Sequence, residues 1–195
     1  MPSDFLSDRK AGLENAFFAR QDAELRRRMA EADARKASKA ALVEVSGIRD
    51  EATLDRLLTL NITSETLAVM SLVPLVAVAW ADGTLESGER SAILRAAEAG
   101  GLNRQSPSYE LLDGWLAKKP SPDLIIAWKQ YIAALLPELD ATAQASLKNE
   151  IVGRARSVAE AAGGFLGLTA RVSDAEQRVL QDLEATFQAP PNAVG

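Results

Sequence analysis

Almost the whole sequence follows the periodicity of α-helices, and this feature limits the chain to an all-helical fold. Apolar residues recur at helical spacing, and no segment keeps the apolar–polar alternation of a half-buried strand. Capping residues precede the apolar runs, and glycines follow several of them. The sequence therefore predicts an all-α protein, a compact helical bundle of about seven helices with a long projecting N-terminal helix.

Local signals place most helix ends. Asp50 and Thr63 can cap helices, and Ser106-Pro107 and Ser121-Pro122 each place a cap before a proline at the first helical position. Ser173 with Glu176 forms the pattern of a capping box. The expected helices are 51–60, 64–80 with a kink at Pro74, 87–99, 107–117, 122–136, 140–162 (closed by Gly163-Gly164) and 174–187.

The chain divides into a charged helical arm (1–45), an all-helical domain (46–188) and a tail (189–195) that we expect to be disordered. The arm is near +1 and the remainder near −6. Its apolar stripe is thin, so a helix here has little to bury on its own. We predict docking of this helix to a protein partner through Leu13, Phe17, Leu25, Arg26 and Met29. A solvated or coiled-coil helix explains the same pattern.

The composition excludes several classes of function. None of the 195 residues is Cys or His, which removes thiolate and imidazole nucleophiles, catalytic triads and most zinc or iron sites. Chemistry would depend on carboxylates, Lys, Tyr, Ser or Thr, and no pattern brings several carboxylates together, so we predict a protein that is not an enzyme. The net charge of −5 argues against nucleic-acid binding. The longest apolar stretch, 67–81, is shorter than the roughly 20 residues of a membrane span.

No secretory signal is visible at the N-terminus, and the expected location is the cytoplasm. The three tryptophans, Trp80, Trp115 and Trp128, lie among Leu and Ile at helical spacing. This spacing predicts core or subunit contacts, with a ligand cage as the alternative. A homo-oligomer is compatible with the sequence.

The segment 82–89 resembles the second half of an EF-hand calcium loop. Asp82, Glu86 and Glu89 fall at positions five, nine and twelve of such a loop, with a glycine after Asp82 for the sharp turn. The first and third positions would be Val78 and Trp80, which offer no side-chain oxygen, so a complete EF-hand is excluded. The three carboxylates remain candidates for a weak Ca²⁺ or Mg²⁺ site. The alternative is a tight turn with acidic residues near a helix N-terminus.

Residues 171–176 echo residues 84–89. Each segment follows an apolar helix, has a loop apolar residue (Leu85 or Val172) and places a glutamate four positions later (Glu89 or Glu176). The echo suggests two helix–loop–helix units packed together. The second loop lacks the Asp-Gly pair, which indicates a structural role there.

The segment 79–83 (Ala-Trp-Ala-Asp-Gly), followed by Leu85 and Glu89-Arg90, resembles the TerB-like family linked to tellurite resistance, over about residues 50–188. The echo at Val172–Glu176 fits the same family. The resemblance implies an all-helical, non-enzymatic interaction module of stress-response assemblies, with acidic, metal-associated loops. By position it implies Asp82, Glu86 and Glu89 as metal residues.

The arm shows a second resemblance. Asp8-Arg9, Glu14-Asn15, Phe17 and then Glu24-Leu25-Arg26 look like the start of the zeta-type inhibitors of bacterial rotary ATP synthases. Members of that family insert an N-terminal helix between catalytic subunits. The alternative function is therefore an inhibitor or regulator of a rotary ATP synthase or a similar large enzyme.

Overall fold

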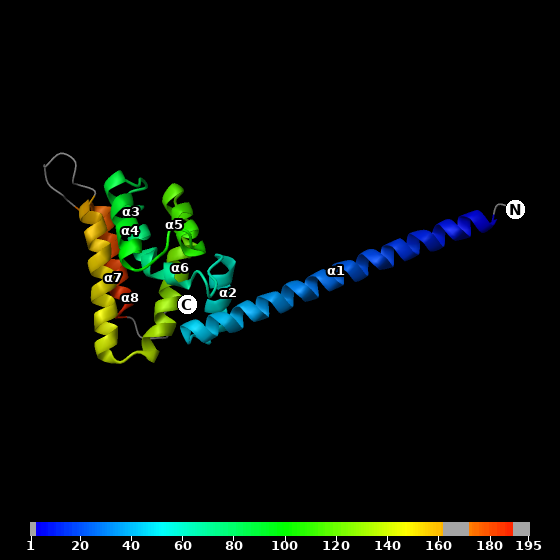
Figure 1. Cartoon of the computed structure of the whole chain (residues 1–195), viewed down its shortest axis with the longest axis horizontal. Coiled ribbons are helices and arrows are strands. Elements are labelled where there is room, and N and C mark those ends of the chain that lie inside the picture. The colour runs from blue at the N-terminus through cyan, green and yellow to red at the C-terminus, as the bar shows by residue number, and fades with distance from the viewer. Residues whose placement is uncertain (1–2, 162–171, 189–195) are drawn as a thin grey trace. The chain divides into compact units, whose positions relative to one another are not determined.

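The structure is a computed structural model that describes residues 3–161 and 172–188, with side chains described for 24–161 and 172–188. Every regular element in these ranges is a helix and none is a strand, which confirms the all-α prediction (Figure 1). Among these residues no helix combines the length and apolar character needed to cross a membrane. The chain forms two compact units, Met1–Ala40 and Ala41–Gly195.

Helix α1 (Ser3–Ser46) is continuous over 44 residues and makes up the described part of the first unit. Residues 25–37 are all exposed. Glu24 pairs with Arg28 at 3.0 Å and with Arg27 at 3.2 Å, and these pairs lie on the surface. Such exposed pairs contribute at most about 1 kcal/mol, so this stretch draws little stability from its own contacts.

The last turn of α1 belongs to the second unit and ends at a glycine. Gly47 has φ of +73°, and its N–H donates to the Val43 carbonyl at 2.8 Å. This left-handed residue closes the helix in the way glycine commonly does. Leu42, one turn earlier, is fully buried in the core of the second unit.

In the described part of the second unit, the chain forms seven further α-helices and two short 3₁₀ helices. Local capping explains several of their starts, as the sequence predicted: Asp50 Oδ2 accepts from the Thr53 N–H at 2.7 Å, and Ser106 Oγ accepts from the Tyr109 N–H at 3.3 Å. The predicted end at Gly163-Gly164 and the predicted tail 189–195 lie outside the described residues. The elements are α2 (Glu51–Thr59), η1 (Leu67–Leu72), α3 (Val73–Ala79), α4 (Ser87–Ala99), α5 (Pro107–Ala117), α6 (Asp123–Leu135), η2 (Leu136–Glu138), α7 (Ala141–Ala161) and α8 (Asp174–Thr186).

The prediction of a single kinked helix over 64–80 is wrong. The segment forms η1 and then α3, with Pro74 in the first turn of α3. Because proline has no N–H, it cannot donate to the carbonyl four residues earlier, and the chain tightens into a 3₁₀ turn just before it. Thr63 is not the cap that the sequence predicted: Thr66 is the N-cap residue of η1 and makes no side-chain cap hydrogen bond. The buried Thr66 hydroxyl instead stabilises the preceding turn, where it accepts from the Thr63 N–H at 2.8 Å and donates to the Asn61 carbonyl at 3.1 Å.

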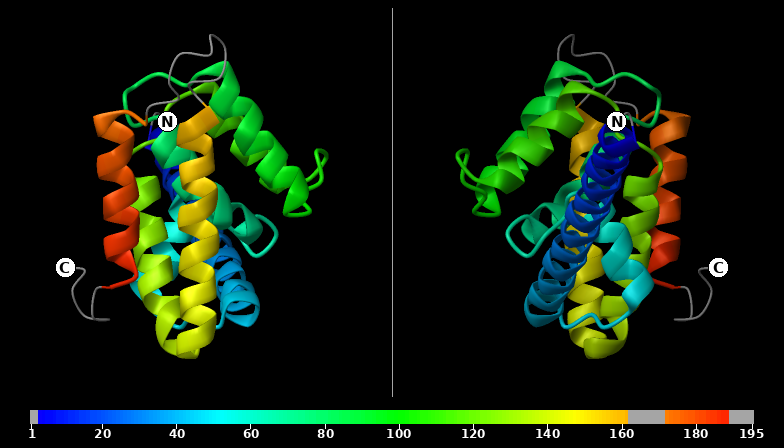
Figure 2. Two further views of the ribbon diagram at one scale, coloured as in Figure 1. Left: turned by 90° about the vertical axis from the view of Figure 1, so that its left-hand side faces the viewer. Right: turned by 90° about the vertical axis from the view of Figure 1, so that its right-hand side faces the viewer.

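Helix α3 forms the centre of the second unit. Six of its seven residues are buried, and it packs against η1, α4, α6, α7 and α8. Figure 2 shows the surrounding helices from two sides. The core continues into Trp128 of α6 and into Leu180 and Leu183 of α8, all 1% exposed or less. Each fully buried leucine contributes about 1.5–3 kcal/mol, so the packing around α3 dominates the stability of the fold.

Candidate functional site

The acidic loop begins with a turn made by Asp82. Its carboxylate Oδ1 accepts from the Thr84 N–H at 2.9 Å and from the Thr84 hydroxyl at 3.0 Å. Gly83, at φ of +96°, supplies the left-handed residue in this turn. Asp82 is exposed and its Oδ1 atom is engaged by the loop itself, so its side chain already has a structural role.

Glu86 and Glu89 occupy the start of helix α4. Glu86 is the exposed N-cap residue, and its backbone N–H donates to Glu89 Oε2 at 2.9 Å. Glu89 is only 2% exposed. The carboxylate of Glu89 therefore points back at the helix end and satisfies a backbone donor there, as in a capping box.

The echo segment builds the same arrangement at the start of α8. The Ser173 N–H donates to Glu176 Oε2 at 2.6 Å, and the Glu176 N–H donates to Ser173 Oγ at 3.2 Å. This capping box agrees with the sequence pattern. Glu176 is 5% exposed, so the matching glutamates of the two segments are both buried.

The two buried glutamates face each other. Burial raises the pKa of Glu89, the hydrogen bond from the Glu86 N–H opposes this rise, and the neighbouring Glu176 carboxyl adds to it through charge repulsion and a side-chain hydrogen bond. Together these effects place the pKa at about 7. Near neutral pH the Glu89 carboxyl is thus partly protonated, and in its protonated form it can donate a hydrogen bond to Glu176. We call Glu89 and Glu176 the glutamate pair.

The sequence pattern identified Glu89 as a candidate site residue but did not identify Glu176 as one. Glu89 was a candidate metal ligand, whereas the second loop was assigned only a structural role. The usable signal was the shared position of both glutamates after an apolar helix and a loop apolar residue. The structure adds that the two glutamate side chains are buried and interact with each other.

The structure does not gather the three predicted metal residues into a cation site. Asp82 and Glu86 are exposed, while Glu89 is buried and holds the helix start. In the described ranges no group of three or more Asp or Glu side chains is arranged to hold a metal ion. Binding of Ca²⁺ or Mg²⁺ through Asp82, Glu86 and Glu89 stays a prediction, and it needs further ligands from elsewhere.

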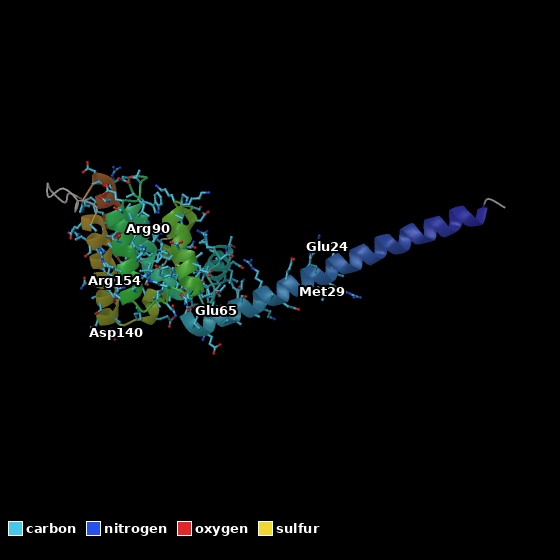
Figure 3. The ribbon with its side chains drawn as sticks, turned by 45° about the horizontal axis from the view of Figure 1, so that its top comes forward. Glu24, Met29, Glu65, Arg90, Asp140 and Arg154 are labelled. Carbon is cyan, nitrogen blue, oxygen red and sulfur yellow. The ribbon has the colours of Figure 1, made fainter. Side chains whose placement is uncertain are left out.

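The predicted partner-binding residues all lie on α1. Leu25 is 57% exposed and Met29 is 59% exposed, and their four-residue spacing places them on one face of the helix. Arg26 beside them is exposed as well. Figure 3 labels Met29 and Glu24 on this stretch. The side chains of Leu13 and Phe17 lie outside the described residues, although the backbone there is helical.

Comparisons with known proteins do not assign a family. No protein-family model matches the chain, and no curated protein or solved structure matches it either. The TerB-like and zeta-type resemblances therefore remain expectations that rest on the residues quoted for them.

Proposed function

We propose that the protein is a non-enzymatic helical interaction module of the TerB-like, stress-response type, and that its N-terminal helix binds a protein partner. The observation that carries this proposal is the exposed pair Leu25 and Met29. Large apolar side chains at helical spacing on a solvated helix are the usual anchors for docking into a groove.

The charge pattern around these two residues supports a one-sided contact. The ion pairs of Glu24 with Arg27 and Arg28 lie among the polar side chains of this stretch. Arg27 also lies 3.7 Å from Glu31. Positions 27 and 31 lie on the face opposite positions 25 and 29, because successive residues turn by about 100° in an α-helix. One face is thus polar and the other offers apolar anchors.

The hydrogen bonds of the carboxylates support a non-enzymatic function. Glu89 and Glu176 each accept a hydrogen bond from a backbone N–H at a helix start, and Asp82 accepts two within its turn. Groups engaged in this way stabilise local structure. In this proposal the exposed loop at Asp82 and Glu86 serves as a secondary contact for a partner or a weakly bound divalent cation.

The test is retention of a partner by full-length protein. We expect Leu25→Gln with Met29→Gln to weaken binding by at least about 100-fold, since each buried apolar side chain contributes about 1.5–3 kcal/mol. The matched control is Arg27→Gln with Glu31→Gln, which makes the same number of changes to glutamine on the opposite face. Glutamine is a good helix former, so far-ultraviolet circular dichroism should stay unchanged in both variants.

The partner is first identified from native extract, and its affinity for each purified variant is then measured by calorimetry. Equal affinity for the wild type and the Leu25/Met29 variant would refute the proposal. The partner's identity also tests the alternative function: a rotary ATP synthase, inhibited by the wild type and not by the Leu25/Met29 variant, would establish the inhibitor role instead.

A further inference from the structure

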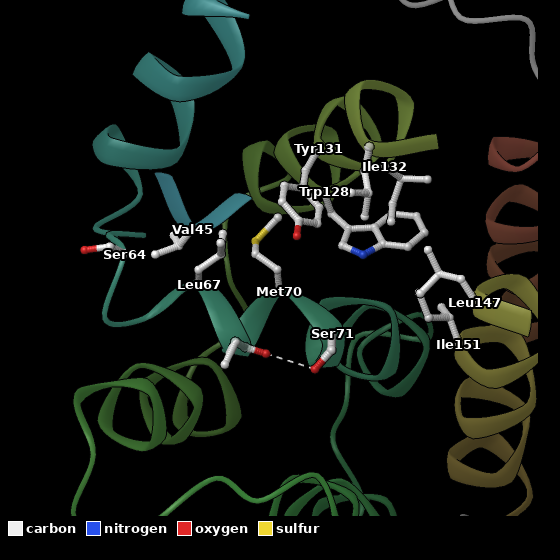
Figure 4. Close-up of a pocket in the computed structure, with 12 residues that line it drawn as sticks. Val45, Ser64, Leu67, Met70, Ser71, Trp128, Tyr131, Ile132, Leu147 and Ile151 are labelled. Carbon is white, nitrogen blue, oxygen red and sulfur yellow. Dashed lines mark hydrogen bonds between the residues drawn. The ribbon is translucent and has the colours of Figure 1, made fainter. Parts of the chain in front are cut away.

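A groove in the second unit has no role in the proposed function. It lies between the end of α1, η1, α6 and α7, and its volume is about 370 Å³. Figure 4 shows the groove and the side chains around it. Its walls are mostly apolar, with Leu67 and Met70 from η1, Ile132 from α6, and Leu147 and Ile151 from α7.

Two polar atoms point into this apolar space. Trp128 is 1% exposed, and in Figure 4 its indole nitrogen faces the open space between Met70 and Ile151. The hydroxyl of Tyr131, one turn further along α6, points into the same space. Neither atom has a hydrogen-bond partner among the residues that the structure describes, whereas Ser71 at the rim donates to the Ala68 carbonyl at 2.9 Å.

The unpaired indole N–H is the feature that points to a ligand. The Trp128 side chain is buried, but its indole nitrogen is not fully enclosed: among the described residues the one enclosed side-chain atom without a partner is Gln130 Oε1. The indole N–H therefore opens onto the groove, where an acceptor can reach it, and indole N–H groups in such places usually find one. An indole can only donate, so the missing partner has to be an acceptor. The Tyr131 hydroxyl offers a second donor or acceptor close by.

The shape and charge of the groove narrow the class of ligand. A cavity of about 150 Å³ accommodates one benzene ring, so about 370 Å³ leaves room for two fused rings. Among the residues whose side chains the structure describes, no Asp, Glu, Lys or Arg lines the groove, and a charged ligand would lose its hydration without gaining a counter-charge from them. Pockets for small molecules typically combine apolar walls with a few polar groups that fix orientation.

We propose that this groove binds an uncharged aromatic molecule of about two fused rings whose hydrogen-bond acceptor receives the indole N–H of Trp128. The aromatic body packs against Met70, Ile132 and Ile151. The Tyr131 hydroxyl orients the same acceptor or a second polar group on the ligand. This site is separate from the α1 face at Leu25 and Met29, so either proposal can fail without the other.

Quinoline and naphthalene form the matched pair of probes for the test. They have nearly the same shape, and only quinoline carries a ring nitrogen that accepts a hydrogen bond while uncharged at neutral pH. For ligands of this size we expect dissociation constants of roughly 10 µM to 1 mM with the full-length protein. The measured quantity is the ratio of the naphthalene Kd to the quinoline Kd, because this ratio removes the hydrophobic contribution that the two probes share.

The variant Trp128→Phe removes the indole N–H, and we expect it to lower this ratio by about 3- to 10-fold, the contribution of one hydrogen bond. The matched control is Trp115→Phe, the same change at a tryptophan that does not line the groove, and it should leave the ratio unchanged. Ala68→Phe places a ring in the groove and should abolish binding of both probes. An equal ratio in the wild type and Trp128→Phe, or no binding of either probe up to about 1 mM, would overturn the proposal.

A second measurement covers the case in which Trp128→Phe does not fold, since Trp128 also packs edge-on against Phe187 with ring centroids 6.1 Å apart. In the NMR spectrum of the wild type, quinoline should move the Trp128 indole proton downfield and slow its exchange with water. Naphthalene should not slow that exchange. The same exchange rate with both probes would overturn the proposal.

Discussion

The glutamate pair makes the stability of this protein depend on pH in an unusual direction. Glu89 has a pKa of about 7 in the folded protein and an ordinary value near 4.5 when unfolded. The folded state therefore binds more protons than the unfolded state between these values, and the free energy of unfolding falls as pH rises through this window. A pKa rise of this size corresponds to a change of about 3 kcal/mol in the free energy of unfolding. The stability gained by protonation is complete below about pH 4.5 and is lost above about pH 7.

The perturbation that isolates this effect is Glu89→Gln. The amide keeps an oxygen that can accept from the Glu86 N–H, and its NH₂ group can donate to Glu176, but it carries no charge. We expect the variant to match the wild type near pH 5 and to exceed it by up to about 3 kcal/mol at pH 8. The assay is urea unfolding followed by circular dichroism at several pH values from about 5 to 8, with the midpoint and slope fitted at each.

Glu110→Gln is the matched control, because Glu110 also lies in the first turn of a helix but is exposed. It should shift the unfolding free energy by no more than about 0.5 kcal/mol at either pH. Wild-type stability that is level or rising from pH 5 to pH 7.5 would refute the reasoning. So would a Glu89→Gln variant that is less stable than the wild type at pH 8.

Three further predictions concern the helix ends and the acidic loop. Asp50→Ala removes the cap that accepts from the Thr53 N–H and should cost about 1 kcal/mol in urea unfolding at pH 7. Hydrogen bonds from the Thr53 side chain and backbone lower the pKa of Asp50, so this cost should shrink as pH falls below about 4, and a cost that stays constant would contradict the reasoning. Gly83→Ala should lower stability by about 1–2 kcal/mol, because an alanine is strained at φ of +96°. Gly114→Ala inside α5, where a Cβ atom meets nothing within 4 Å, should raise stability by about 0.5–1 kcal/mol. Equal effects of the two variants would contradict the idea that backbone conformation causes the difference. Millimolar Ca²⁺ should leave the thermal midpoint nearly unchanged, because the described carboxylates of the loop do not converge; a rise of about 5–10 °C that Asp82→Ala abolishes would instead establish a metal site.

Local chemistry accounts for the parts of the fold that could be predicted. The start of α5 follows from Ser106 and the start of α8 from Ser173 with Glu176, because a cap needs only residues within one helical turn. The helical nature of α1 follows from its composition in the same way. The predicted start of α6 was wrong by one residue. Ser121 was expected to be the cap and Pro122 the first helical residue, but Pro122 is the N-cap, and Ser121 Oγ accepts from the Asp123 N–H.

The features of the site depend on contacts between distant parts of the chain. The sequence echo showed that Glu89 and Glu176 occupy matching positions, but no periodicity says that α4 and α8 begin side by side. The groove at Trp128 likewise forms from the end of α1, η1, α6 and α7. Spacing within one helix predicts which residues share a face, and it does not predict which other helix that face meets.

The position of α8 in the core affects how the protein is made. Leu180 and Leu183 complete the interior against α3 and α7, and Glu176 reaches Glu89 from the same helix. During synthesis at about 5–20 residues per second, the preceding helices leave the ribosome several seconds before α8 can dock. In that interval α3 presents an uncovered apolar surface to the cell. We therefore expect the nascent chain to need chaperones until its last described helix emerges, and we expect substitutions in α8 to reduce soluble yield more than their effect on the finished fold would suggest.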